Sequence, residues 1–181
     1  MINRTTSFEE LAFLVCTAFD QDGTTAVLSG GGAATIYAPL AHQSRDLDFI
    51  IQFRFGIGYA SASPILDLGF VREGGTYVHP DSDFTVEFPT GPLAIGEELV
   101  RTWHTIRNRD LLLHIISPTD CVRDRLAWYL FNNDHSSLQQ ALGVALAQPI
   151  DLQAIESWCT REGEPGKFRI FKERLERLAH Q

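Results

Sequence analysis

Two aspartates separated by a single residue, Asp46 and Asp48, are the groups in this 181-residue chain best suited to metal chemistry. They begin an apolar run expected to form a strand over 46–53. Since side chains alternate across a strand, Asp46 and Asp48 would share one face, with Leu47 and Phe49 in the core. Two adjacent carboxylates repel each other, and a divalent cation between them relieves that repulsion. The pattern therefore predicts a divalent metal site where this strand begins.

A glycine-rich stretch precedes the aspartates and is suited to binding phosphate. Ser29, Gly30, Gly31 and Gly32 follow a short apolar strand over 25–28 and lead into a helix expected over 33–40. Backbone N–H groups at a glycine turn and a helix N-terminus bind phosphate oxygens. A phosphate-binding site beside paired metal ligands is the combination that phosphoryl or nucleotidyl transfer requires.

Together these two stretches resemble the nucleotidyltransferase superfamily of the polymerase-beta type, in which a Gly-Gly or Gly-Ser turn precedes an Asp-x-Asp or Asp-x-Glu strand. Residues 44–49, Ser-Arg-Asp-Leu-Asp-Phe, are most similar to minimal bacterial nucleotidyltransferases of the abortive-infection and toxin–antitoxin type. The chain departs from the pattern at Gly32, where many relatives supply a serine hydroxyl to the phosphates. Ser29 is the residue that would have to compensate.

The resemblance implies a two-metal mechanism with a nucleoside triphosphate as substrate. Asp46 and Asp48 would bridge two Mg²⁺ ions, and a carboxylate on a later strand would hold the ion that activates an acceptor hydroxyl. Glu87 is the candidate for that third carboxylate, because it lies within a strand expected over 83–88. Alternation places Asp83, Thr85 and Glu87 on the polar face of that strand, so Asp83 is the alternative.

Two arginines are candidates for binding the nucleotide phosphates. Arg125 lies eight residues after Ser117, in a Ser-Pro-x-Asp helix start that resembles one in related minimal transferases. The alternative for Arg125 is an exposed helix arginine paired with a nearby acid. Arg45 directly precedes Asp46 and either contacts the nucleotide or offsets the carboxylate charge. With Ser29, Gly30 and Gly31, these arginines make up the predicted nucleotide-binding set.

The remaining patterns predict an α+β fold, with a small mixed sheet and flanking helices followed by a helical C-terminal part. We expect a nucleotidyltransferase-like domain over 1–116 and a helical domain over 117–181. A first helix over 7–19 begins with a capping box formed by Ser7 and Glu10. Further strands are expected over 70–72 and 76–79, with 106 and 111–116 as possible additions. The other segments expected are a small-residue turn region over 56–63, a short helix over 64–69, and four C-terminal helices beginning near 117, 137, 151 and 168.

Composition limits the partners and the location. The net charge of −8 disfavours non-specific binding to DNA or RNA. No apolar run approaches the roughly 20 residues that span a bilayer, and no signal-peptide pattern is present, so we expect a cytoplasmic protein. The three cysteines are scattered and are expected to be buried and reduced. The three tryptophans are expected to be core anchors rather than stacking platforms for bases.

The acceptor is left open by the sequence and is a protein, a tRNA or a small molecule such as a sugar or antibiotic. A different class of function is a catalytically silent transferase fold that binds a partner as an antitoxin-like module. The missing Gly-Ser hydroxyl, the shortage of lysine and the acidic net charge favour that alternative. Metal-dependent binding of a nucleoside triphosphate distinguishes the two.

Overall fold

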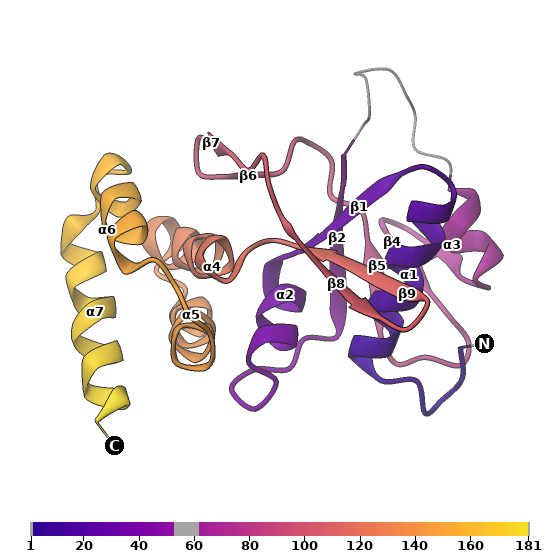
Figure 1. Cartoon of the computed structure of the whole chain (residues 1–181), viewed down its shortest axis with the longest axis horizontal. Coiled ribbons are helices and arrows are strands. Elements are labelled where there is room, and N and C mark those ends of the chain that lie inside the picture. The colour runs from indigo at the N-terminus through magenta and orange to yellow at the C-terminus, as the bar shows by residue number, and fades with distance from the viewer. Residues whose placement is uncertain (1, 53–61, 181) are drawn as a thin grey trace.

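The computed structural model describes residues 2–52 and 62–180, and its centre is a mixed sheet. Seven described strands pair in the order β3-β4-β5-β2-β1-β9-β8 (Figure 1). β2 runs antiparallel to β1 and parallel to β5, and β1 runs parallel to β9. The strands are β1 (Thr25–Ser29), β2 (Asp46–Gln52), β3 (Val71–Glu73), β4 (Thr76–Val78), β5 (Thr85–Glu87), β8 (His104–Asn108) and β9 (Leu111–Ile115), with β6 (Ala94–Ile95) and β7 (Glu98–Leu99) forming a separate hairpin.

Helices flank this sheet, and the described chain after β9 consists of helices without further strands. They are α1 (Phe8–Gln21), α2 (Gly30–Tyr37), α3 (Ser63–Asp67), α4 (Pro118–Asn132), α5 (His135–Ala147), α6 (Leu152–Arg161) and α7 (Pro165–Ala179). The predicted α+β class, with a mixed sheet followed by a helical part, is confirmed. Residues 111–115 do add a strand to the sheet, and β8 pairs with it. The division into domains at 116 and 117 stays a prediction.

Local sequence signals explain where several helices begin. The Ser7 hydroxyl accepts the Glu10 N–H, and the Glu10 carboxylate accepts the Ser7 N–H, which completes the predicted capping box of α1. Ser117 and Asp151 accept hydrogen bonds from backbone N–H groups in the first turns of α4 and α6. These caps satisfy N–H groups that helix starts leave unpaired.

The structure differs from the sequence-based expectation in one helix and one strand of the site, α2 and β5. α2 begins at Gly30 instead of residue 33 and ends at Tyr37, since Pro39 forces Ala38 out of the helical region. β5 is three residues long, and it begins at Thr85 instead of residue 83 because the Ser82 hydroxyl accepts the Phe84 N–H and makes a turn there. The predicted turn region over 56–63 lies mostly outside the described residues, as does residue 53.

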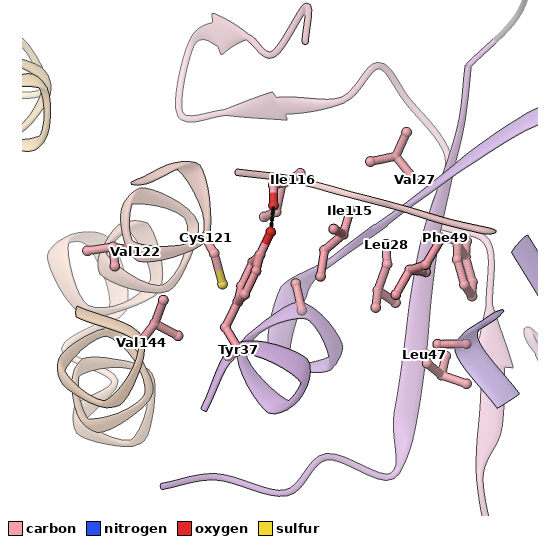
Figure 2. Close-up of a cluster of buried hydrophobic side chains, with 14 of the residues drawn as sticks. Val27, Leu28, Tyr37, Leu47, Phe49, Ile115, Ile116, Cys121, Val122 and Val144 are labelled. Carbon is pink, nitrogen blue, oxygen red and sulfur yellow. Dashed lines mark hydrogen bonds between the residues drawn. The ribbon is translucent and has the colours of Figure 1, made fainter. Parts of the chain in front are cut away.

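A continuous core joins the sheet to the C-terminal helices through α2. Figure 2 shows Tyr37 between the sheet and the helix that carries Cys121, with Leu28 and Phe49 packed farther along the same core. The Tyr37 hydroxyl donates a 2.7 Å hydrogen bond to the Ile116 carbonyl at the end of β9. Burial raises the pKa of Tyr37, so this donor keeps its proton. The contact ties the C-terminal end of α2 to the segment that joins β9 to α4.

Two further expectations concern the rest of the chain. Cys16, Cys121 and Cys159 are free and buried, as predicted. Among the described residues, no helix is both long enough and apolar enough to cross a membrane.

Candidate functional site

The strand register brings the predicted carboxylates to one face of the sheet. β2 and β5 run parallel with Asp46 opposite Thr85 and Asp48 opposite Glu87. Directly opposed residues in a sheet project from the same face, so Asp48 and Glu87 are neighbours across the two strands. On the other side of β2, Ser29 lies opposite Asp48. The end of β1, the start of β2 and the end of β5 thus form one polar edge.

Threonine hydroxyls hold two of these carboxylates. Thr85 donates to Asp46 Oδ1 at 2.5 Å, and Thr76 on β4 donates to Glu87 Oε1 at 2.8 Å. Within residues 2–52 and 62–180, no three His, Cys, Asp or Glu side chains stand close enough together to hold a metal ion as a group. Binding of a metal by Asp46, Asp48 and Glu87 therefore stays a prediction. Asp83 lies outside β5 and is exposed, so it has no place in the register.

Asp48 is electrostatically the most perturbed of the three carboxylates. Its pKa is raised to about 6, first by burial and then by the negative charge of Glu87, with smaller contributions from Asp46 and Asp124. Arg125 opposes this effect. An acid with a raised pKa beside other acids is a common property of functional sites, and it is the electrostatic situation that a bound cation relieves.

The N-terminus of α2 lies against Asp48. Ser29 is the N-cap residue, but its hydroxyl makes no cap bond within the described part of the chain and donates to the Asp48 carbonyl at 3.3 Å instead. Gly30 has φ +66°, and a Cβ built there would stand 2.7 Å from Asp48 Oδ2. Position 30 therefore needs glycine for its backbone and for its close approach to the carboxylate. The first N–H groups of α2 have no side-chain cap and are suited to an anion.

The two predicted arginines occupy different settings. Arg125 lies on α4 with a largely buried side chain, where it forms an ion pair with Asp124 at 2.6 Å and donates to Gln140 Oε1 at 3.4 Å. Burial and then the charge of Arg125 lower the pKa of His42, and the same charge opposes the rise in the pKa of Asp48. Arg45 is exposed, and its guanidinium makes no hydrogen bond to the described residues. Arg125 is therefore placed at the site, whereas Arg45 lies beside it in solvent.

A pocket of about 270 Å³ is lined by Ser29, Gly30, Asp48 and Arg125 among the predicted site residues. The other predicted residues do not line it: Gly31, Arg45, Asp46 and Glu87. The N-terminus of α2, β2, the β6–β7 hairpin and α4 all contribute to its wall. Larger hollows of about 350 and 460 Å³ elsewhere are not lined by any described aspartate. The residues lining the 270 Å³ pocket are Ser29, Gly30, Asp48, Ile50, Pro89, Pro92, Leu93, Ala94, Ile95, Ile116, Asp124, Arg125 and Trp128.

Several residues in or beside this pocket were not predicted from the sequence. Trp128 was expected in the core, yet it is 52% exposed and lines the pocket three residues after Arg125. Its spacing from Arg125, which puts both on one helix face, was the available signal. Leu93 and Ile95 lie in a segment for which the sequence predicts neither a helix nor a strand, although Ile95 is in β6. Gln140 on α5 reaches the site only because α4 and α5 pack together, which no local pattern indicates.

Comparison with known proteins bears on the fold. The structure is similar to a nucleotidyltransferase-like antigenic protein from Paracoccidioides brasiliensis, with a TM-score of 0.55 and 13% identity over 80% of this chain and 78% of that one. The chain therefore has a nucleotidyltransferase-like fold. It is also similar to the antibiotic-resistance factor ANT(2'')-Ia, with a TM-score of 0.51 and 12% identity over 96% of this chain and 99% of that one. No protein-family model matches the sequence, and no curated protein is significantly similar to it.

Proposed function

We propose that this protein is a metal-dependent nucleotidyltransferase that moves a nucleoside monophosphate from a nucleoside triphosphate to a hydroxyl group. One observation carries the proposal: a single pocket joins the uncapped N-terminus of α2, the Asp48 carboxylate and the Arg125 guanidinium. The α2 N-terminus and Arg125 offer hydrogen-bond donors to a polyphosphate, and Asp48 places a carboxylate beside them. The nucleotidyltransferase-like fold of the two similar structures supports the same activity.

The pocket suggests how a nucleoside triphosphate would lie. Its phosphates would accept hydrogen bonds from the Gly30 and Gly31 N–H groups, with Arg125 neutralising part of their charge. Its base would lie against Trp128 and the apolar side chains of Leu93 and Ile95, which line the same pocket. Aromatic side chains provide such stacking surfaces for bases.

The carboxylates fit a magnesium requirement by their chemistry. Asp46, Asp48 and Glu87 offer only oxygen ligands, which hard cations prefer. Burial and the negative charge of Glu87 raise the pKa of Asp48, and a bound cation would oppose both effects. Mg²⁺ bound by Asp46 and Asp48 would neutralise phosphate charge and polarise the α-phosphate toward attack. Two ions, with Glu87 serving the second, are part of this proposal.

The reaction would form one bond and break another at the α-phosphorus. The acceptor oxygen attacks in line, the bond to the β-phosphate oxygen breaks, and pyrophosphate leaves. The proton of the hydroxyl passes to a carboxylate of the site, for which Glu87 is placed beside Asp48. Holding both substrates in one pocket reduces the entropic part of the barrier.

The acceptor is a protein, a tRNA or a small molecule. The local string over residues 44–49, which we predicted to resemble minimal transferases of the abortive-infection and toxin–antitoxin type, favours a macromolecular hydroxyl. The structural similarity to an antibiotic-resistance factor favours a small one. The net charge of −8 disfavours a tRNA bound through general electrostatics. A cytoplasmic location, where nucleoside triphosphates are abundant, belongs to the same proposal.

A transfer assay tests the activity. Wild-type protein is incubated with each α-³²P-labelled nucleoside triphosphate, Mg²⁺ and a cell extract, in parallel with the double variant Asp46→Ala, Asp48→Ala. We expect label in one acceptor with the wild type and none with the variant. Absence of transfer and of Mg²⁺-dependent nucleotide binding with all four nucleotides would leave the silent partner-binding module as the better description.

A further inference from the structure

The β6–β7 hairpin forms one wall of the pocket but belongs to no larger sheet in the described part of the chain. Its strands pair only with each other, Ala94 with Leu99 and Ile95 with Glu98, and the Val100 N–H donates to the Leu93 carbonyl at 2.9 Å. Leu93 and Ile95 are nevertheless buried, at 4% and 3% exposure. Packing of these two side chains on the core, and polar contacts outside the hairpin, must therefore hold this wall in place.

Glu98 connects the hairpin to two C-terminal helices. Its Oε2 contacts Arg123 Nη2 of α4 at 2.5 Å, and its Oε1 accepts from Nε and Nη2 of Arg161 on α6 at 2.9 and 2.5 Å. Both carboxylate oxygens are thus used by guanidinium groups from different helices. The Arg161 hydrogen bonds and the Arg123 charge hold the pKa of Glu98 below its usual value, so the carboxylate is ionised at neutral pH.

Arg123 is itself held in a rigid setting. Its Nη1 donates to Asp120 Oδ1 at 3.0 Å, and Asp120 is in turn held by the Ser117 hydroxyl at 2.7 Å. The Arg123 guanidinium lies 5.3 Å from the ring centroid of the fully buried Trp158. An isolated surface ion pair contributes little to the free energy of unfolding. Arg123 is already held by several contacts, so it loses less side-chain entropy when it pairs with Glu98.

The turn of the hairpin makes a second contact with α6's C-terminal end. Gly96 has φ +59°, and a Cβ there would overlap the Glu162 carboxylate. The hairpin therefore lies closely against Glu162 as well as being bound through Glu98. α6, which makes these contacts, lies on the side of the hairpin that faces away from the seven-stranded sheet (Figure 1).

We propose that Glu98 is a positioning residue that fixes the hairpin wall of the pocket to α4 and α6, and thereby sets the width of the space for the nucleotide base. The inference rests on the proposed function for the identity of the ligand. Trp128 lies on α4, five residues after Arg123, so the helix that binds Glu98 of the hairpin also contributes to the pocket lining. Without the Glu98 contacts, only side-chain packing would hold the hairpin on α4 and α6, and the width of the pocket lined by Leu93, Ile95 and Trp128 would vary.

The first test needs no nucleotide. Hydrogen exchange of the Val100 amide is compared in wild type, Glu98→Gln and the matched control Glu97→Gln, which removes one charge from an exposed neighbour. We expect at least tenfold faster exchange in Glu98→Gln and unchanged exchange in the control. Arg161→Gln, which removes one partner on an exposed side chain, should show a smaller increase and serves if Glu98→Gln does not fold. Unchanged exchange in both variants would overturn the inference.

The second test separates positioning from general stability. In the transfer assay we expect Glu98→Gln to raise KM for the nucleoside triphosphate at least fivefold while kcat stays within twofold of wild type, with Glu97→Gln unaffected. Faster exchange with unchanged KM would overturn the positioning role and leave a structural contact. A wild type that binds no nucleotide would instead overturn the proposed function, while the exchange experiment would still decide whether Glu98 fixes the wall.

Discussion

The carboxylate of Asp48 lies close to the backbone of Gly30, since a Cβ at position 30 would stand 2.7 Å from Asp48 Oδ2. The residues come from different elements, β2 and the start of α2. Their proximity makes the proposed metal ligand and the proposed phosphate donors parts of one site. Gly31, the next residue, has no such restriction, because its nearest neighbours would lie 3.5 to 3.7 Å from a Cβ.

This difference predicts opposite effects for two similar substitutions. Gly30→Ala should lower the free energy of unfolding by about 2 kcal/mol or more, because it adds a left-handed backbone penalty to a steric overlap. Gly31→Ala should be neutral or stabilise by up to about 1 kcal/mol, because alanine favours the helix. Urea unfolding of both variants measures the difference. Equal stability of the two variants would mean that the glycine turn relaxes at no cost.

The raised pKa of Asp48 predicts a pH-dependent stability. The folded state holds Asp48 with a pKa of about 6, against 3.8 for an ordinary aspartate. Its contribution to stability is therefore fully present below about pH 4 and is lost as the pH rises to 6. Asp48→Asn removes this loss. Above pH 6 in metal-free buffer, the free energy of unfolding of the variant should therefore exceed that of wild type by about 2–3 kcal/mol.

The control for this effect is Asp83→Asn, which removes an exposed acid that takes no part in the register. Its stability should follow that of wild type across pH 4–8. Thermal melts at each pH supply the comparison, and the advantage of Asp48→Asn should shrink toward pH 4. An Asp48→Asn protein that fails to fold would identify Asp48 as a structural residue and contradict the functional assignment.

Mg²⁺ and a nucleoside triphosphate should stabilise the protein only when present together, because the phosphates complete the coordination that the carboxylates leave open. At a hundredfold excess over Kd, a ligand adds about 2.7 kcal/mol to the free energy of unfolding. For a chain of this size, that corresponds to a melting shift of roughly 5–10 °C. The double variant Asp46→Ala, Asp48→Ala should show no shift, and a shift in that variant would place the nucleotide elsewhere.

The sequence was informative wherever a local pattern decides the structure. The capping signals of Ser7 and Ser117 and the alternation around Asp46 and Asp48 each depend on neighbours a few residues away, and these features were predicted correctly. The start of α2 was misplaced because glycine is a poor helix former, and only tertiary packing brings Gly30 and Gly31 into the helix.

The rest of the candidate site depends on contacts that are distant in the sequence. Glu98 meets Arg161 across 63 residues, and Gln140 meets Arg125 only after α5 folds back along α4. A two-residue strand such as β6 carries too little alternation to be recognised. Trp128 was assigned to the core because tryptophan is usually buried there, although the helix leaves it half exposed at the pocket.

The exposed position of Trp128 leads to the last prediction, which concerns recognition of the base. Trp128→Ala should weaken binding of the nucleoside triphosphate by about 1–3 kcal/mol, the range for loss of base–aromatic stacking. Trp128→Phe keeps an aromatic surface and should lose less. Tryptophan fluorescence should be quenched when nucleotide and Mg²⁺ bind to wild type, and that response should be absent in Trp128→Phe even though binding persists.

Phe131 provides the matched control, because it lies on α4 three residues beyond Trp128, is 53% exposed and does not line the pocket. Phe131→Ala removes a comparable exposed aromatic from the same helix, so it should leave nucleotide affinity and the fluorescence response unchanged. Isothermal titration with each nucleotide and with inorganic triphosphate completes the comparison. Trp128→Ala should not alter the affinity for inorganic triphosphate, which has no base. Equal losses for nucleotide and triphosphate would mean that Trp128 supports the phosphate site instead of contacting the base.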